Sequence, residues 1–362
     1  MRSLFLALAL AVGSPVLLGG CDKINDLTGD KKAKAEKEDD DDEGSAKKKK
    51  SKKKDDEKAD AKSAAPAPVN APSAPVAGPA AASLAHMPAG CQVLLTLNAS
   101  KVLAHPIVAK EIVPLLEQKL SSPPGSDEDV KKLQEFLRVT GLSLSGLRDG
   151  AFCGIGFTKG KGGDTWGLAV GAGLKPDSVV PAFEKEGGAT VLDLDGRKAL
   201  QAKNGMVGGQ FADGVAGLAT NADVFKTMNA PAAPAYRVDT SKELSFVVSE
   251  ELIKTAFKDD KKTPEPMKAM KSASGFLDLA GGKAEVRLVT GSPEDAKKLD
   301  GLVALLTGEF AKDQKPGSLE EMLFKTVKTR LDGSDVVLEL PIPEAMLTQA
   351  ASFIVAELKK VK

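Results

Sequence analysis

Aromatic residues and histidine are scarce in this chain of 362 residues. It contains one Trp, one Tyr and 13 Phe, and its only histidines are His86 and His105. So few Trp and Tyr side chains argue against a function that stacks sugars or cages cations on aromatic rings. The two histidines show no metal-ligand spacing and no Cys-x-x-Cys is present, so the sequence indicates no metal site and no other cofactor.

The residue patterns of common enzyme classes are also missing. A Ser-His-Asp triad would need one of the two histidines, and the sequence has no Gly-x-Ser-x-Gly turn to receive it. The glycine-rich run at 159–163 joins two expected strands and does not open a helix, so it does not fit a phosphate cradle. Paired carboxylates such as Glu250 and Glu251 fit a solvated helix surface better than a catalytic cleft. We therefore expect a protein that is not an enzyme, and a hydrolase is disfavoured.

Neither sign of charge is in excess. The chain has 50 basic and 50 acidic residues, and no half of it is strongly basic. A nucleic-acid partner would require a basic surface, so none is expected.

The first 20 residues have the pattern of an export signal. Arg2 precedes an apolar run from Leu4 to Leu18, which is short for a membrane span of about 20 residues. The run ends in Leu18-Gly19-Gly20-Cys21, the pattern of a lipobox. The alternatives are an ordinary signal peptide with an incidental cysteine, or an uncleaved anchor.

This N-terminus resembles that of bacterial lipoproteins as a class. The resemblance implies cleavage before Cys21, a diacylglycerol thioether on its sulfur, and a fatty acyl group such as palmitate on its amine. Acyl chains contribute ~0.8 kcal/mol per buried CH₂, so two or three of them make a stable membrane anchor. The folded part would then lie outside the cytoplasm, in the periplasm. Asp22 marks inner-membrane retention in enteric bacteria, a rule that does not transfer to all bacteria, so which membrane holds the anchor stays open.

Residues 21–84 predict a disordered tether. Blocks of acidic residues and lysine come first, and an Ala/Pro-rich stretch follows, so apolar residues are too few to offset the entropy of folding. One interpretation is a solvated spacer. The other is that the lysine block at 47–54 contacts anionic lipid or cell-wall polymer, although the acidic blocks would weaken that attraction within a Debye length of ~8 Å.

The rest of the chain predicts an α+β fold with two related units, 85–238 and 239–362. Hairpins dominate, so we expect mostly antiparallel sheets with helices packed on one face. Each unit has the order strand, helix, hairpin, helix, hairpin, helix, which suggests a tandem duplication. The expected strands are 93–97, 151–158, 165–173, 190–194, 198–202, 207–211, 215–220, 244–248, 274–279, 284–290, 326–331 and 336–340. The expected helices are 100–120, 127–139, 175–186, 221–228, 249–257, 292–310 and 343–359.

The start of the folded part, Met87-Pro88-Ala89-Gly90-Cys91-Gln92-Val93, resembles a strand motif of bacterial envelope proteins of unknown function. That resemblance supplies no catalytic residues. Once Cys21 is acylated, Cys91 and Cys153 are the remaining thiols, and an oxidising envelope would let them form a disulfide. The alternative is two buried, unconnected cysteines.

Two functions are compatible with these patterns. The first is a lipid-anchored, non-enzymatic binding or scaffold module whose partner is another envelope protein or the cell wall. The second is a carrier or chaperone for a lipid or another apolar ligand, because the interior is aliphatic and poor in aromatic residues.

Overall fold

The structure is a computed structural model that describes residues 82–360, except for 122–127, 158–164, 185–188, 212–213, 230–237, 259–262 and 316–317. The expected signal peptide, the lipidation site Cys21 and the tether up to residue 81 therefore lie outside the described residues.

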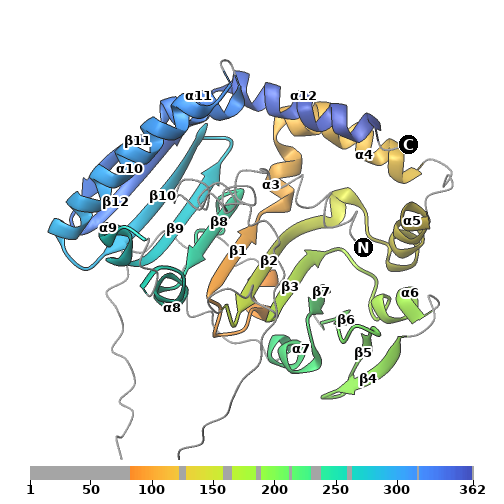
Figure 1. Cartoon of the computed structure of the whole chain (residues 1–362). Coiled ribbons are helices and arrows are strands. Elements are labelled where there is room, and N and C mark those ends of the chain that lie inside the picture. Colours follow the sequence, from red (N-terminus) through yellow and green to blue (C-terminus); the bar gives the residue numbers. More distant parts are fainter. Residues whose placement is uncertain are drawn as a thin grey trace, which may run out of the picture. The chain divides into compact units, whose positions relative to one another are not determined.

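Twelve strands of the described part form one antiparallel sheet (Figure 1). Their order across the sheet is β11-β12-β10-β9-β8-β1-β2-β3-β7-β6-β5-β4, and every hydrogen-bonded neighbour is antiparallel. The α+β class with a mostly antiparallel sheet is confirmed. The strands are β1 (Val93–Leu97), β2 (Leu147–Ile155), β3 (Thr165–Ala172), β4 (Thr190–Leu194), β5 (Arg197–Gln201), β6 (Val207–Gln210), β7 (Val215–Ala219), β8 (Leu244–Val248), β9 (Met270–Asp278), β10 (Lys283–Thr290), β11 (Lys328–Asp332) and β12 (Asp335–Pro341).

Helices connect these strands, and most of them lie where the sequence predicts one. The α-helices are α3 (Ala99–Ala104), α4 (Val113–Ser121), α5 (Glu128–Thr140), α6 (Val179–Glu184), α7 (Ala222–Asn229), α8 (Glu250–Ile253), α9 (Glu265–Lys268), α10 (Pro293–Asp313), α11 (Leu319–Thr326) and α12 (Glu344–Lys360). The 3-10 and π-helical turns are η1 (Ala82–His86), η2 (Val108–Ile112), η3 (Leu144–Gly146) and η4 (Lys254–Lys258).

The stretch expected to be helical over 100–120 is divided into α3, η2 and α4. His105 ends α3 with an extended backbone, at φ −60° and ψ 131°. It precedes Pro106, and the proline ring disfavours the helical conformation of the residue before it. The break at this proline therefore follows from local sterics.

The fold begins earlier than the tether prediction allows. Residues 82–84 were expected in the tether, yet η1 buries Ser83 and Leu84. The backbone N–H of Ser83 donates to Asp149 Oδ1 at 2.9 Å, which ties η1 to β2. The ring of His86 stacks on Phe211 with centroids 4.1 Å apart. These contacts make η1 part of the core.

The strand order is nearly symmetric about the central pair of β8 and β1. On one side come β9, β10, β12 and β11, and on the other come β2, β3, β7 and β6, with β5 and β4 as an additional hairpin. We call β1–β7 with their helices the first half and β8–β12 with theirs the second half. This arrangement is what duplication of one unit would produce.

Hydrogen-bond register matches the two halves residue by residue. Val93 and Leu244 open the two central strands, which pair antiparallel with each other. In the first half Val93 faces Gly154, and in the second half Leu244 faces Leu277. Each position in β1 and β2 therefore has a definite counterpart in β8 and β9.

The counterparts also share hydrogen bonds. The N–H of Asn98 donates to the Glu243 carbonyl at 2.8 Å, and the N–H of Ser249 donates to the Gln92 carbonyl at 2.8 Å. Asn98 caps α3 with its side chain, and Ser249 caps α8 in the same way. Both central strands therefore end in an N-cap residue that starts the following helix.

Two buried cores lie on opposite faces of the sheet, whereas the sequence led us to expect helices on one face. In the first half Leu94, Cys153 and Ala169 share one face and are buried together with residues of α7. In the second half Leu288 and Val336 lie on the other face, against α10. Side chains alternate between faces along a strand, so these registers require helices on both sides.

Candidate binding surface

The two faces of the central strand β1 differ sharply in burial. Leu94 and Thr96 point to the face covered in the first half and are buried. Leu95 and Leu97 point to the opposite face and are only half-buried. A large aliphatic side chain in the middle of a twelve-stranded sheet is usually a fully buried core residue. The partial exposure of Leu95 and Leu97 therefore marks their face as a candidate binding surface.

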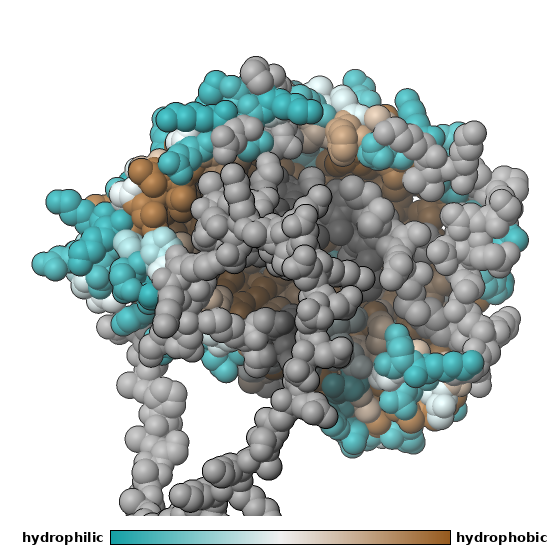
Figure 2. All heavy atoms as spheres, in the orientation of Figure 1, coloured by the Kyte–Doolittle hydropathy of each residue, from teal (hydrophilic) through white to brown (hydrophobic). Residues whose placement is uncertain are grey.

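Neighbouring strands extend this half-buried surface. Phe152 and Phe246 flank Leu95 on the two adjacent strands, and directly paired residues of antiparallel strands point to the same side. All of these side chains are in the intermediate class of exposure. We define the apolar face by the residues Leu95, Leu97, Phe152, Leu168, Leu244, Phe246, Leu277 and Val286. Figure 2 shows hydrophobic side chains within the hollow in the middle of the side in view.

Two glycines on the apolar face have different surroundings. At Gly275, an added Cβ would lie 2.6 Å from the ring of Phe246, so that ring already fills the space above the glycine. At Gly150, the nearest atom to an added Cβ is the Ala169 carbonyl oxygen, at 3.7 Å. Gly150 pairs with Leu97. The surface beside Leu97 therefore has unoccupied space that a side chain could fill.

A layer of helices joins the two halves at one end of the sheet. Helix α12, from the second half, contacts η2 and α4, from the first half (Figure 1). A cavity of about 250 Å³ between α4 and α12 is lined by Leu115, Gln118, Lys119, Leu358 and Lys359. This is below the roughly 300–1,000 Å³ typical of small-molecule sites, so the cavity alone would not enclose a drug-sized ligand.

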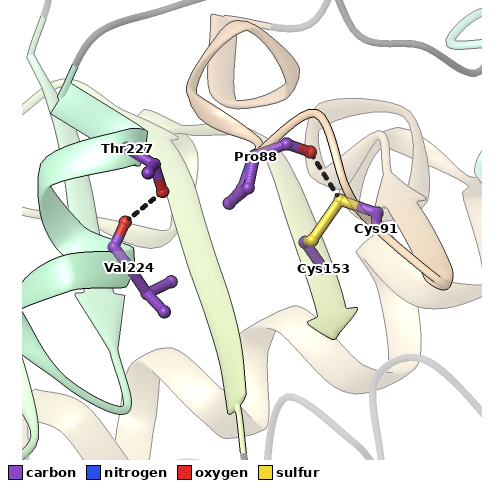
Figure 3. The surroundings of a disulfide bond; sticks show 5 residues. All are labelled: Pro88, Cys91, Cys153, Val224 and Thr227. Atoms are coloured by element: carbon purple, nitrogen blue, oxygen red, sulfur yellow. Dashed lines mark hydrogen bonds between the residues drawn. A yellow bond between two sulfur atoms is a disulfide. The ribbon is translucent and has the colours of Figure 1, made fainter. Parts of the chain in front are cut away.

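The opposite face of the first half carries a disulfide between Cys91 and Cys153. The two sulfurs are 2.12 Å apart and the Cα atoms are 5.3 Å apart. Figure 3 shows Val224 of α7 beside this bond. Cys153 pairs with Leu94, whose side chain points away from the apolar face. Cys91 Sγ also lies 2.9 Å from the Pro88 carbonyl oxygen. A disulfide sulfur carries no proton, so this contact could be a donated hydrogen bond only in the thiol form.

Two buried polar side chains occupy matching positions beside the central strands. Gln92 Oε1 accepts a hydrogen bond from the Phe157 N–H at 2.7 Å. Glu243 Oε2 accepts one from the Leu279 N–H at 3.1 Å. Both side chains are buried. Each thus satisfies a backbone donor just beyond the neighbouring strand, with an amide in the first half and a carboxyl in the second.

An ion pair lies next to Glu243. The Lys242 ammonium donates to Asp278 Oδ2 at 2.6 Å, and the Gly281 N–H donates to Asp278 Oδ1 at 2.7 Å. The hydrogen bond from Lys242 lowers the pKa of the Asp278 carboxyl and raises the pKa of the Lys242 ammonium. Lys242 also stands 5.2 Å from the ring centre of Phe276, within cation–π range.

Sequence reasoning found some of these features and missed others. It singled out Cys91 and Cys153, which the fold brings together, and Cys21, which lies outside the described residues. It did not identify the apolar face, although alternation along Val93–Leu97 puts Leu95 and Leu97 on one face and Leu94 and Thr96 on the other. Nor did it identify Gln92 and Glu243, because their relation depends on the match between the halves.

Two further observations concern only the described residues. Among them, no three His, Cys, Asp or Glu side chains are grouped so that they could hold a metal ion. None of the helices in this part of the chain is long and apolar enough to cross a membrane.

Comparison with known proteins gives few matches. No family model and no curated protein matches the chain. Among solved structures, crystal forms III, I and IV of the protein TP0453 match with TM-scores of 0.44, 0.42 and 0.41. Their sequence identities are 9%, 8% and 9%, and the alignments cover 76%, 76% and 75% of this chain and 99%, 98% and 96% of those chains. Scores below 0.5 do not establish a common fold.

Proposed function

We propose that this chain is a non-enzymatic binding module of the bacterial cell envelope, anchored through acylated Cys21, and that its apolar face binds an apolar ligand such as a lipid acyl chain. The lipobox supports the anchor and the location. The half-exposure of Leu95, Leu97 and Phe246 in the middle of the sheet carries the binding proposal, because large apolar side chains at such positions are usually sealed from water.

The chemistry of the apolar face favours an aliphatic ligand. Its members are Leu, Val and Phe, and no charged side chain belongs to it. Burying a ligand CH₂ group against such a surface contributes about 0.8 kcal/mol. A chain of several CH₂ groups lying along Leu95, Leu97 and Leu244 would therefore bind measurably without any polar contact.

A direct test uses the chain with Cys21→Ser, so that its own acyl groups are absent. Its organic extract is examined by mass spectrometry, and binding of a fluorescent fatty acid is titrated. The Gly150→Leu variant places a side chain in the space beside Leu97, where a new Cβ meets nothing closer than 3.7 Å. Filling the volume of two or three ligand CH₂ groups should weaken binding about tenfold or more.

A matched control separates the apolar face from general surface hydrophobicity. Leu305 on α10 is 58% exposed and lies outside the apolar face. Leu305→Ser should leave the titration unchanged. Equal binding by Gly150→Leu and the Cys21→Ser parent, with both proteins folded, would rule out this surface as the ligand site.

The second candidate is a scaffold that holds another envelope protein or the cell wall. The exposed Phe353 on α12, at 61%, favours it, since a large exposed aromatic side chain is a frequent anchor in protein interfaces. Cross-linked cells carrying wild type or Phe353→Ser would be compared by pull-down. A specific protein captured by the wild type and lost with Phe353→Ser would favour the scaffold over the ligand-binding proposal.

A further inference from the structure

The disulfide is sealed inside the first core. Cys153 is 0% exposed and Cys91 is 2% exposed. They belong to a buried cluster that also includes Leu84 of η1 and Val224 of α7. Figure 3 shows Val224 and Thr227 of α7 to one side of the bond. In the closed fold, an oxidant or reductant therefore has no path to either sulfur.

The covering elements come from both sides of the cysteines in the chain. Helix α7 begins at Ala222, well after Cys153, and η1 precedes Cys91. Met228 of α7 lies against β3, where its Sδ would be 2.6 Å from a Cβ added at Gly167. Its carbonyl oxygen is 2.9 Å from His86 Nδ1 of η1. Helix α7 thus contacts both β3 and η1, and the core over the sulfurs is complete only when these elements are together.

We infer that Cys91 and Cys153 are oxidised before α7 docks, by exchange with an oxidising disulfide present while the chain folds. The oxidant is a protein or a small-molecule disulfide. This inference does not depend on the proposed ligand, because it rests only on the burial of the sulfurs and on the order of the covering elements.

The chemistry is ordinary thiol–disulfide exchange. The thiolate of one cysteine attacks the oxidant's disulfide, which forms a mixed disulfide and releases one thiolate of the oxidant. The thiolate of the second cysteine then attacks the mixed disulfide and releases the other. Two protein thiols are oxidised to a disulfide, the oxidant's disulfide is reduced to two thiols, and the two protons pass to the thiolates released.

One consequence is that the fold preserves the redox state in which it closed. A chain that folds with Cys91 and Cys153 reduced stays reduced in an oxidising buffer until α7 opens. The supply of oxidant must therefore coincide with folding, and oxidation of finished protein is slow because it waits for partial unfolding.

The experiment uses the full chain with Cys21→Ser, so that only the two relevant thiols remain. Reduced protein is exposed to oxidised glutathione in native buffer and over a urea series, and oxidation is followed by alkylation and mass. We expect oxidation in native buffer to be at least about 100-fold slower than in the unfolded chain, and to accelerate with urea as opening becomes easier. Oxidation in native buffer within about threefold of the unfolded chain's rate would overturn the inference.

A pair of variants tests the role of α7 directly. Met228→Ala removes a buried side chain that holds α7 to the sheet and should accelerate oxidation in native buffer. Leu305→Ala removes an exposed side chain from α10 and should not. Equal rates in the two variants would contradict the assignment to α7. If the reduced chain does not fold at all, oxidation necessarily acts on an unfolded chain, and the inference stands.

Discussion

Cys91 and Cys153 in the first half occupy the positions of Lys242 and Phe276 in the second. In the register that matches Val93 to Leu244, the first half has a buried disulfide at the position where the second half has a cation–π contact and an ion pair. Both arrangements join the start of a central strand to the next strand, so two different kinds of chemistry link these elements at corresponding points of the two halves.

The reason lies in what covers each half. In the first half α7 contacts β3, β6, β7 and η1, and the face beneath it is buried. In the second half the corresponding helix, α12, contacts η2 and α4 instead. The same face of the second half carries a charged group, Arg287, which lies 2.8 Å from Asp335 and 2.9 Å from Asp332. Burial favours an uncharged cross-link, whereas partial exposure permits an ion pair.

The largest expected effect is loss of the disulfide. In the Cys91→Ala, Cys153→Ala double variant, the unfolded chain gains the freedom of a loop whose ends are 62 residues apart. The chain-entropy estimate for such a loop is about 4 kcal/mol of unfolding free energy. Urea denaturation of the variant and of oxidised wild type measures the difference. A loss of unfolding free energy below about 1 kcal/mol would contradict this prediction, because the disulfide would then stabilise the fold no more than an ion pair does.

The second largest loss of stability is expected at Gly167 of β3, where Met228 of α7 approaches closely. Gly167→Ala should reduce stability by about 1–3 kcal/mol, because the new Cβ would meet Met228 Sδ at 2.6 Å. Gly150→Ala is the matched control, a strand glycine with open space, and should be neutral or slightly stabilising. Thermal unfolding of both variants tests the contrast, which fails if they shift the midpoint equally.

Exchanging the matched residues Gln92 and Glu243 for each other's type should cost different amounts of stability in the two halves. Gln92→Glu puts a carboxylate next to the sealed disulfide, where the counterpart of Lys242 is Cys91, and should cost about 1–3 kcal/mol at neutral pH. Glu243→Gln keeps an acceptor for the Leu279 N–H and should cost less than about 1 kcal/mol. Urea titrations at pH 7 compare the two. Equal costs would mean that the halves do not differ in their tolerance of charge.

The ion pair gives the smallest effect, and its pH dependence has a definite sign. The hydrogen bond from Lys242 lowers the pKa of Asp278. The ion pair therefore stabilises the fold above the carboxyl's usual pKa of 3.8, and this stabilisation is lost as pH falls through the lower pKa that Asp278 has in the folded state. At pH 7 Asp278→Asn should cost below about 1 kcal/mol. Stability measured from pH 7 to pH 2 should fall more steeply for wild type than for Asp278→Asn, and parallel curves would contradict the assignment.

Much of the secondary structure follows from local signals. Strand β8 was predicted at its observed bounds, and each hairpin lies within a few residues of its expected place. Asp-Gly and Gly-Gly pairs mark tight turns because glycine adopts positive φ, as Gly196, Gly282 and Gly333 do. Helix α11 was missed, because it follows α10 closely and is only eight residues long.

The candidate binding surface could not be predicted in the same way. Leu94 and Leu95 are adjacent and chemically identical, and no local property shows which of them is buried. Their difference arises because α7 and η1 cover one face of the first half. Likewise, Gln92 and Glu243 are far apart in sequence, and only strand pairing gives them equivalent roles.

The sequence by itself therefore determined the strands, the turns, the helix caps and the lipobox, since each depends on the conformational preferences of neighbouring residues or on a short contiguous motif. Tertiary structure alone decided which face of the sheet is sealed, that Cys91 meets Cys153, and that Lys242 meets Asp278 at the corresponding point. These outcomes depend on which helix covers which face, and that coverage is set by packing between segments far apart in the chain.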